Sequence, residues 1–259
     1  MKQPASFSVL SAFLPPALAL AIAVAVWETW VRLDDVPEYL VPAPSAIGAC
    51  LVDDPLFFLR QGGVTLMGAM LGFALGAGVA VLLAVFMAHS RFLEKSLFPV
   101  AIMVKVTPIV AIAPLLAIWF GFGLLPKVFI AALIVFFPVM VNAVIGFRSV
   151  NPWALDLLRS LAASPWEVFV KLRVPSSLPY LFAAFKVSIP LSVIGAVVAE
   201  WFSGQDGLGR VIQVSNSNLD MPMAFAAIVS LAALGISLYV ITSFLERRLL
   251  FWHESSISM

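Results

Sequence analysis

Long apolar stretches, separated by short polar segments, dominate the chain. Six of these stretches hold the roughly 20 mostly apolar residues that a helix needs to cross a bilayer. The pattern therefore predicts an all-α polytopic membrane protein with six transmembrane helices. The expected spans are Phe13–Val31, Val64–Ala88, Leu97–Phe120, Pro126–Phe147, Leu178–Trp201 and Met223–Leu245.

The segments between the spans carry further signals. Residues 41–45, Val-Pro-Ala-Pro-Ser, predict an extended turn that leads into a short helix from Ala46 to about Leu59. We expect this helix along the outer interface or against the bundle. In the loop from Phe202 to Pro222, glycines provide backbone freedom for a turn or a re-entrant segment. These glycines are Gly204, Gly207 and Gly209.

Glycines and prolines also interrupt the spans. Gly68, Gly72 and Gly76 form two overlapping GxxxG steps, which permit close helix approach either within the chain or at a subunit interface. Prolines inside the third, fourth and fifth spans each remove a helical hydrogen bond. They predict kinks, which either shape the bundle or line a path that opens and closes. These prolines are Pro108, Pro114, Pro138 and Pro190.

Composition supports the membrane assignment. Of 259 residues, 62% are hydrophobic and 11% are charged, whereas an average soluble domain is about 45–50% apolar and about 25% charged. The formal net charge of +1 gives no reason to expect a nucleic-acid partner. Cys50 is the only cysteine, which excludes an intrachain disulfide. The first apolar stretch is interpreted as an uncleaved helix, with a cleaved signal peptide as the alternative.

Basic residues predict the orientation, because Lys and Arg concentrate in cytoplasmic loops. With six spans both termini lie on one side, and most of the basic residues fall on that side. We therefore expect both termini and the polar segment Asp156–Pro179 in the cytoplasm. The residues on this side are Lys2, Arg91, Lys95, Arg148, Arg159, Lys171, Arg173, Arg247 and Arg248, and those opposite are Arg32, Arg60, Lys127 and Arg210.

Two lysines lie well inside predicted spans, where charged residues usually face the bundle interior or water. Lys105 and Lys186 each follow a cytoplasmic span end by a similar number of residues, so their ammonium groups are expected at similar depth. They are candidates for the solute pathway, and pairing with helix carbonyls is the alternative. Glu200, near the outer end of the fifth span, is expected at the interface.

The segment Asp156–Pro179 is the longest polar interruption in the second half of the chain, yet its apolar residues recur at helical spacing. This pattern predicts short amphipathic helices at a membrane surface, broken near Pro165 and ended at Pro175. A segment of this kind either docks a partner or simply covers the bundle.

Common catalytic motifs are missing. The sequence has no GxxxxGK[ST] phosphate loop, so this chain is not expected to hydrolyse ATP. His89 and His253 stand alone, and there is no HExxH or GxSxG motif. We expect a non-catalytic transport protein without a bound metal or cofactor. Its energy comes from an ion gradient, from another subunit, or from no source at all. Without a partner subunit it would be a secondary transporter or a channel.

The polar segment resembles the cytoplasmic motif of binding-protein-dependent ABC importer permeases. That motif reads EAA, three residues, Gly, nine residues and then IxLP. Asp156-Leu157-Leu158 stand at EAA, Ala162 at the glycine, and Leu172-Arg173-Val174-Pro175 at IxLP. The spacing matches in full, while Asp replaces Glu, leucines replace the alanines and Ala replaces Gly. Residues 162–166, Ala-Ala-Ser-Pro-Trp, are similar to the family's usual continuation.

Other tracts extend the resemblance from about residue 41 to the C-terminus. Residues 41–45, the run PLLAIWFGFG at 114–123, Phe137-Pro138 and residues 206–209, Asp-Gly-Leu-Gly, look like the nitrate, sulfonate and taurine branch of these permeases. That branch also includes transporters of pyrimidine-type thiamine precursors.

The resemblance implies one permease domain, residues 1–259, of type I importer fold, with a core five-helix unit at about 64–250 and a cytoplasmic coupling loop at 148–177. It also implies a bacterial inner-membrane location. Implied partners are ATP-binding cassette subunits that carry ATP and Mg, a second permease copy, a periplasmic or lipid-anchored solute-binding protein, and lipid. The implied ATPase-coupling residues are Asp156, Arg159, Ala162, Ala163, Ser164, Trp166, Leu172 and Pro175.

Overall fold

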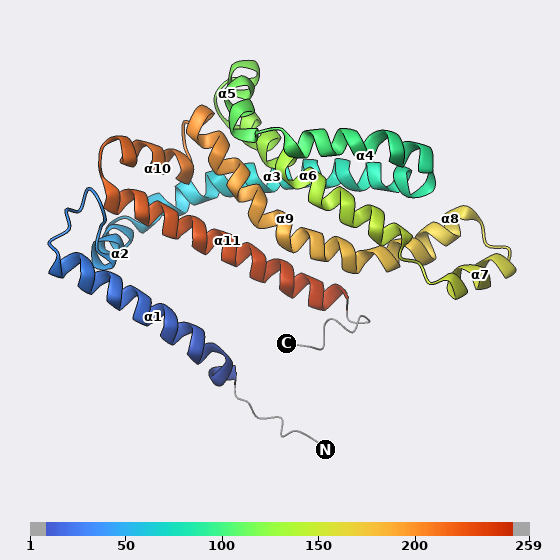
Figure 1. Ribbon diagram of the computed structural model, residues 1–259, viewed down its shortest axis with the longest axis horizontal. Helices are drawn as coiled ribbons and strands as arrows, with labels where there is room; N and C mark the ends of the chain where they lie inside the picture. Colours follow the sequence, from blue (N-terminus) through green and yellow to red (C-terminus); the bar gives the residue numbers. More distant parts are fainter. Residues whose placement is uncertain (1–8, 251–259) are drawn as a thin grey trace.

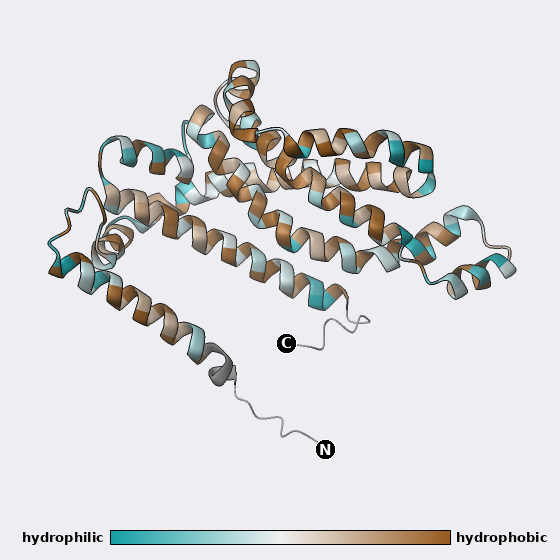
Figure 2. Ribbon diagram, in the orientation of Figure 1, coloured by the Kyte–Doolittle hydropathy of each residue, from teal (hydrophilic) through white to brown (hydrophobic). Residues whose placement is uncertain are grey.

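The computed structural model describes residues 9–250, which form helices joined by short turns (Figure 1). The elements are α1 (Val9–Leu33), α2 (Pro44–Asp53), α3 (Pro55–His89), α4 (Arg91–Val106), α5 (Ile109–Phe120), α6 (Leu124–Arg148), α7 (Pro152–Ser160), α8 (Pro165–Val168), the π-helical turn η1 (Phe169–Arg173), α9 (Val174–Ser203), α10 (Leu208–Ser217) and α11 (Met221–Leu249). Figure 2 shows hydrophobic residues along the long helices and hydrophilic ones near α10 and on α7.

The core consists of α3, α6 and α9, with α6 packed most extensively against the other two and α3 also in contact with α9. Close approach at both contacts depends on glycine. A Cβ on Gly72 would lie 2.7 Å from the carbonyl oxygen of Val128, and a Cβ on Gly195 would lie 2.7 Å from the Cα of Ala131. The GxxxG steps of α3 therefore serve helix packing within the chain, the first of the two alternatives.

Five of the described helices are long and apolar enough to cross a membrane, and they account for five of the predicted spans. The third predicted span, Leu97–Phe120, is not one straight helix. It divides into α4 and α5, which meet at 91°. Thr107 and Pro108 are extended there, because the proline ring disfavours the α conformation in the residue before it. If this bent pair crosses as one unit, the spans number up to six.

A second boundary differs from prediction. The helix expected from Ala46 to about Leu59 ends at Asp53, and Leu59 belongs to α3. The interruption falls at Asp54, which precedes a proline and accepts a 3.0 Å hydrogen bond from the backbone N–H of Phe57 as the N-cap of α3. The second span is therefore longer than predicted. Helix α2 packs on α11, as the bundle alternative requires.

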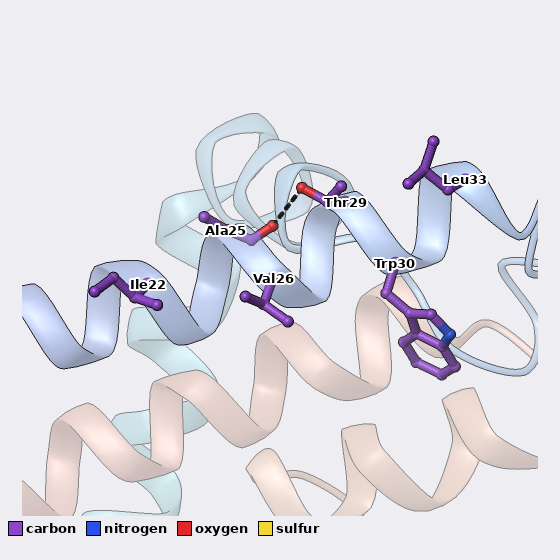
Figure 3. Close-up of a pocket in the computed structure, with 6 residues that line it drawn as sticks. All are labelled: Ile22, Ala25, Val26, Thr29, Trp30 and Leu33. Carbon is purple, nitrogen blue, oxygen red and sulfur yellow. Dashed lines mark hydrogen bonds between the residues drawn. The ribbon is translucent and has the colours of Figure 1, made fainter.

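Helix α1 lies beside the bundle and contacts mainly α2 (Figure 1). Its polar attachment is Glu28, whose carboxylate accepts hydrogen bonds from Arg32 and from both the backbone N–H and the hydroxyl of Ser45. A shallow apolar groove runs along its exposed face (Figure 3), where the hydroxyl of Thr29 donates to the carbonyl of Ala25. This face has the character expected for contact with lipid.

Helices α2 and α10 meet the first turns of α3 and α11 at one end of the bundle, and α7 and α8 lie at the other (Figure 1). A buried apolar cluster joins the first group. Its members are Ile47, Phe58, Leu208, Ala226 and Ala227. The loop from Phe202 to Pro222, predicted as a glycine-rich turn or re-entrant segment, thus contains the short helix α10.

Candidate functional site

The polar segment between α6 and α9 forms a protruding pair of short helices, α7 and α8 (Figure 1). Asn151 caps α7 by accepting a 2.9 Å hydrogen bond from the backbone N–H of Trp153. The chain then turns between Ser160 and Pro165, where the sequence predicted a break.

Ala162 makes this turn through a left-handed backbone conformation, with φ of 52°. The N–H of Ala162 donates to the carbonyl of Arg159 at 3.0 Å, and the N–H of Ala163 donates to that of Leu158 at 3.0 Å. This pair of bonds is a Schellman motif, in which the left-handed position is usually glycine. The residue aligned with the motif glycine thus has the conformation that glycine favours.

Ser164 starts α8 with a capping box. Its hydroxyl accepts a 3.3 Å bond from the N–H of Glu167, and the carboxylate of Glu167 accepts a 2.9 Å bond from the N–H of Ser164. Pro165 occupies the first helical position, where a missing N–H costs nothing. The two helix ends therefore fix the turn from both sides.

Large apolar side chains of this segment are exposed. Trp153 is 83% exposed and Trp166 is 70% exposed, and Leu157 and Leu161 are also exposed. Asp156 and Arg159 form a 3.4 Å ion pair at the surface, of a kind that contributes only about 0–1 kcal/mol and leaves both groups accessible. Exposed apolar groups beside accessible charges are typical of a protein contact surface.

Leu172 and Pro175 do not lie in α7, α8 or the turn between them, where the other predicted coupling residues lie. Both are half-buried in the helical connection to α9. The prediction that a helix ends at Pro175 is wrong, because the chain continues as helix from Pro165 to Ser203. The π-helical turn before Pro175 widens the backbone, which accommodates a proline that lacks an N–H.

Two contacts connect the segment to the bundle. The ring of Phe169 lies 5.8 Å from that of Phe147 at the end of α6 and 5.6 Å from that of His89 at the end of α3. Arg148, the last residue of α6, donates to both carboxylate oxygens of Glu94 at 2.7 and 2.8 Å and to the carbonyl of Met87 at 2.8 Å. Phe169 thus packs the segment against the ends of α3 and α6, and Arg148 ties the end of α6 to α3 and α4.

The two candidate pathway lysines do not meet the same neighbours. Lys186 forms an ion pair with Glu246 on α11. Lys105 is exposed and its ammonium group lies 4.6 Å from the ring centroid of Phe137 on α6. The sequence prediction placed Glu246 one residue beyond the last span and so gave Lys186 no acidic partner.

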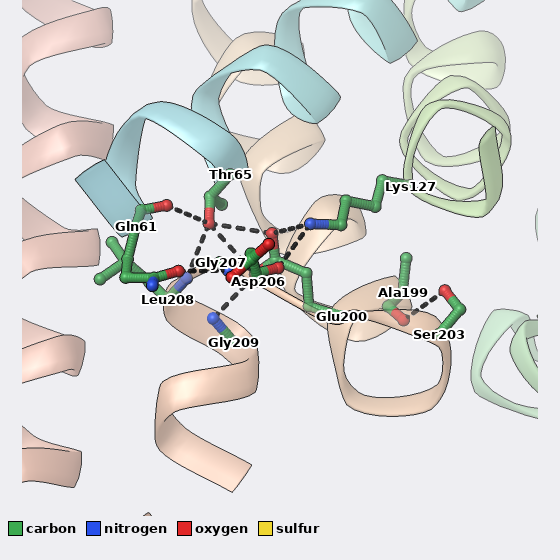
Figure 4. Close-up of polar contacts among 10 residues, drawn as sticks. All are labelled: Gln61, Thr65, Lys127, Ala199, Glu200, Ser203, Asp206, Gly207, Leu208 and Gly209. Atoms are coloured by element: carbon green, nitrogen blue, oxygen red, sulfur yellow. Dashed lines mark hydrogen bonds and ion pairs between the residues drawn. The ribbon is translucent and has the colours of Figure 1, made fainter. Parts of the chain in front are cut away.

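A buried polar cluster near α10 was not predicted (Figure 4). Glu200, expected at the interface, is 0% exposed, and Lys127, counted on the outer side at the start of the fourth predicted span, is 2% exposed. The ammonium group of Lys127 donates to Glu200 at 3.0 Å and to the carbonyl of Asp206 at 2.6 Å. Opposite charges hydrogen-bonded in this way satisfy groups that would otherwise be costly to bury.

Thr65 and the loop before α10 complete this Lys127–Glu200 cluster (Figure 4). The hydroxyl of Thr65 lies 3.0 Å from the Glu200 carboxylate and accepts a 2.9 Å bond from the N–H of Leu208. The N–H of Gly209 donates to Glu200 at 2.8 Å. The cluster thus joins α3, α6, α9 and α10. Within residues 9–250 no group of three His, Cys, Asp or Glu side chains is arranged to hold a metal ion.

Comparison with known proteins identifies relatives over almost the whole chain. Residues 63–251 match the model of the family described as "Binding-protein-dependent transport system inner membrane component". The chain is 34% identical to the riboflavin transport system permease protein RibX of Chloroflexus aurantiacus, covering 95% of this chain and 94% of the relative. It is 32% identical to the formylaminopyrimidine transport permease protein ThiX of Halalkalibacterium halodurans, and the match covers 93% of this chain and 96% of that relative. The putative aliphatic sulfonates transport permease protein SsuC of Bacillus subtilis is 29% identical, and the match covers 91% of this chain and 86% of that relative.

Solved structures show the same fold at lower sequence identity. The MetNI methionine ABC transporter in inward-facing conformations contains a chain with a TM-score of 0.60 and 17% identity, which covers 74% of this chain and 96% of its own. A chain of an amino acid ABC transporter has a TM-score of 0.56 and 20% identity, and the match covers 76% of this chain and 96% of that chain.

Proposed function

This chain belongs to the family of binding-protein-dependent transport system inner membrane components, and we propose that it forms the solute pathway of an ATP-driven importer and couples it to a separate ATPase. It is a permease subunit of an ABC transporter. The observation that carries the proposal is the segment α7–α8, in which a left-handed Ala162 stands at the motif glycine between exposed apolar residues.

The proposed docking surface comprises the exposed part of this segment. Ala162, Ala163 and Ser164 form the turn that enters a cleft of the ATPase, and Trp166 packs beside it. Asp156 and Arg159 make polar contacts at the margin. Leu172 and Pro175 belong to the connection that transmits movement to α9, while ATP and Mg are bound by the ATPase.

In the proposed mechanism, closure of two ATPases moves the segments of two permease copies together. Phe169 and Arg148 pass this displacement to α3, α4 and α6, whose packed core moves as a unit. The assembly comprises two copies of this chain in the lipid of a bacterial inner membrane, with both termini cytoplasmic. A periplasmic or lipid-anchored binding protein delivers the solute at the opposite end.

The proposed solute is a nitrogen heterocycle of the flavin or pyrimidine type. The support is that two relatives at 34% and 32% identity are named for riboflavin and formylaminopyrimidine. Sulfonate, taurine and nitrate are the competing solutes, with a sulfonate relative at 29%. Uptake of labelled riboflavin, formylaminopyrimidine and an aliphatic sulfonate by cells with and without the chain distinguishes these classes.

The coupling proposal is tested by purifying the chain from its native membrane in mild detergent. We expect an ATPase with a phosphate loop to copurify and to hydrolyse ATP. Ala163→Glu places a charge against the ATPase cleft and should abolish both copurification and uptake, while Ser217→Glu, an exposed change near the opposite end, should leave copurification intact. Solute flux driven by an ion gradient in liposomes containing this chain alone would instead establish a secondary transporter.

A further inference from the structure

A cavity of about 370 Å³ opens at the end of the bundle opposite to α7 and α8, between the first turns of α3 and α11, the loop before α10, and α10 itself. Polar side chains from α3, the loop before α10, α10 itself and the turn before α11 line it. They are Gln61, Gln205, Asp206, Arg210, Ser215, Asn218 and Asp220. The segment from α7 to η1, proposed to dock on the ATPase and called the coupling segment below, occupies the other end. This cavity therefore faces the side from which the proposed function delivers the solute.

The Lys127–Glu200 cluster holds one wall of the cavity in place (Figure 4). The carbonyl of Asp206 accepts the 2.6 Å bond from Lys127, and the N–H of Gly207 donates to the side chain of Gln61 at 2.6 Å. Gly207 has φ of 118°, and a Cβ at this position would collide with the carboxylate of Glu200. The wall is therefore a preorganised surface, which lowers the cost of binding a partner.

The lining favours a cationic group with an apolar stem. The charged lining comprises two carboxylates, Asp206 and Asp220, and one guanidinium group, Arg210, which donates to the side chain of Gln213 at 2.7 Å. The lining therefore carries a net negative charge, and Asp206 is exposed. Carboxylates and amide oxygens accept hydrogen bonds, and such bonds are strongest from charged donors. Phe57, Val211 and Met223 provide apolar lining, which suits the methylene groups of Lys or Arg.

We propose that this cavity receives a basic side chain, Lys or Arg, from the soluble binding protein that delivers the solute. The inference rests on the proposed function, which places this end outside the cytoplasm and supplies such a partner. In it, Asp206 makes the charged contact, and Lys127 and Glu200 act as positioning residues that fix the main chain of Asp206.

The test is a titration of the reconstituted transporter with its own binding protein, purified with the solute that supports uptake, with ATPase activity as the readout. Asp206→Asn removes the charge but keeps the carbonyl that bonds Lys127. We expect the binding-protein concentration for half-maximal stimulation to rise about tenfold, the effect of losing one charge-assisted hydrogen bond. The increase in this concentration with ionic strength should be smaller in the variant than in the native protein.

Asp53→Asn is the matched control, because Asp53 is an exposed carboxylate near the same end but outside the cavity. It should shift the half-maximal concentration less than twofold. Basic residues of the binding protein are then changed singly to Ala, and one change should cost nothing further in the Asp206→Asn background. Equal shifts for Asp206→Asn and Asp53→Asn, or fully additive losses for every basic residue, would overturn the cavity proposal. Absence of any ATPase in the preparation would instead overturn the proposed function.

Discussion

Ala162 stands at the glycine of the family motif and has a left-handed backbone conformation, which glycine favours. Its φ of 52° costs an L-residue with a Cβ roughly 1 kcal/mol that glycine does not pay. Ala162→Gly should therefore stabilise the turn by about that amount and slow amide hydrogen exchange at the C-terminal end of α7. Ala163→Gly is the control, because Ala163 does not have a positive φ. Faster exchange in Ala162→Gly would contradict the strain assigned to this position.

Lys127 and Glu200 give a residue-scale prediction about stability. Lys127→Met leaves a buried carboxylate without its ammonium partner, which should cost about 3–5 kcal/mol. The double variant Lys127→Met with Glu200→Gln should recover part of this loss, because no charge is then left buried. Thermal unfolding in detergent measures both, with the exposed Arg60→Met as control. A double variant no more stable than Lys127→Met would show that the charge is not the cause.

The sequence predicts the break near Pro165 but not the buried pair, for a physical reason. The effect of a proline on a helix is local, so the break can be recognised from neighbouring residues, while Ala162 and Ser164 were identified through the family resemblance. Lys127 and Glu200 are 73 residues apart, and their contact depends on which faces of α6 and α9 meet. The available signal was that both are charged residues next to long apolar runs, with a glycine-rich loop close behind Glu200.

At the scale of elements, helix type and order follow from the apolar pattern, while boundaries depend on proline context. Asp54-Pro55 and Thr107-Pro108 both interrupt helices, as expected from the restriction on the residue before proline. Pro175 does not, because the π-helical turn absorbs it. The pattern of single residues does not distinguish these outcomes, since the tertiary contacts of Phe169 support the π-helical turn.

The attachment of α11 to α9 provides an element-scale prediction. Lys186 pairs with Glu246, so Lys186→Met and Glu246→Gln should each loosen α11 and lower the unfolding temperature. If the pair serves only this attachment, both variants leave the solute concentration for half-maximal uptake unchanged. A change in that concentration for Lys186→Met alone would instead assign this lysine to the solute pathway. Labelled-solute uptake in proteoliposomes, corrected for the amount of assembled transporter, distinguishes a structural role of Lys186 from a role in the solute pathway.

At the scale of the whole molecule, one packed core joins the two ends at which we propose that partners dock. The coupling segment contacts the ends of α3 and α6, and the Lys127–Glu200 cluster joins α3, α6 and α9 near the other end. Between them, glycines bring the three helices into backbone contact. Because close-packed interiors transmit displacement rather than absorb it, we expect coupling to depend on this tight packing.

Gly76 and Gly78 of α3 test this dependence. A Cβ on Gly76 would meet the backbone of Ala132, with its Cα at 2.8 Å, whereas a Cβ on Gly78 would find nothing within 4 Å. Gly76→Ala should separate α3 from α6, cost about 1–3 kcal/mol and lower the solute imported per ATP hydrolysed. Gly78→Ala gives the same gain in helix propensity without the collision, so it should be neutral or slightly stabilising. Uptake and ATP hydrolysis are measured together in proteoliposomes. A variant that is only less stable loses uptake and hydrolysis in proportion. A variant with a loosened core loses more uptake than hydrolysis. Equal ratios of uptake to hydrolysis in the two variants would show that the contact between α3 and α6 supports the fold and does not carry the signal between the ends.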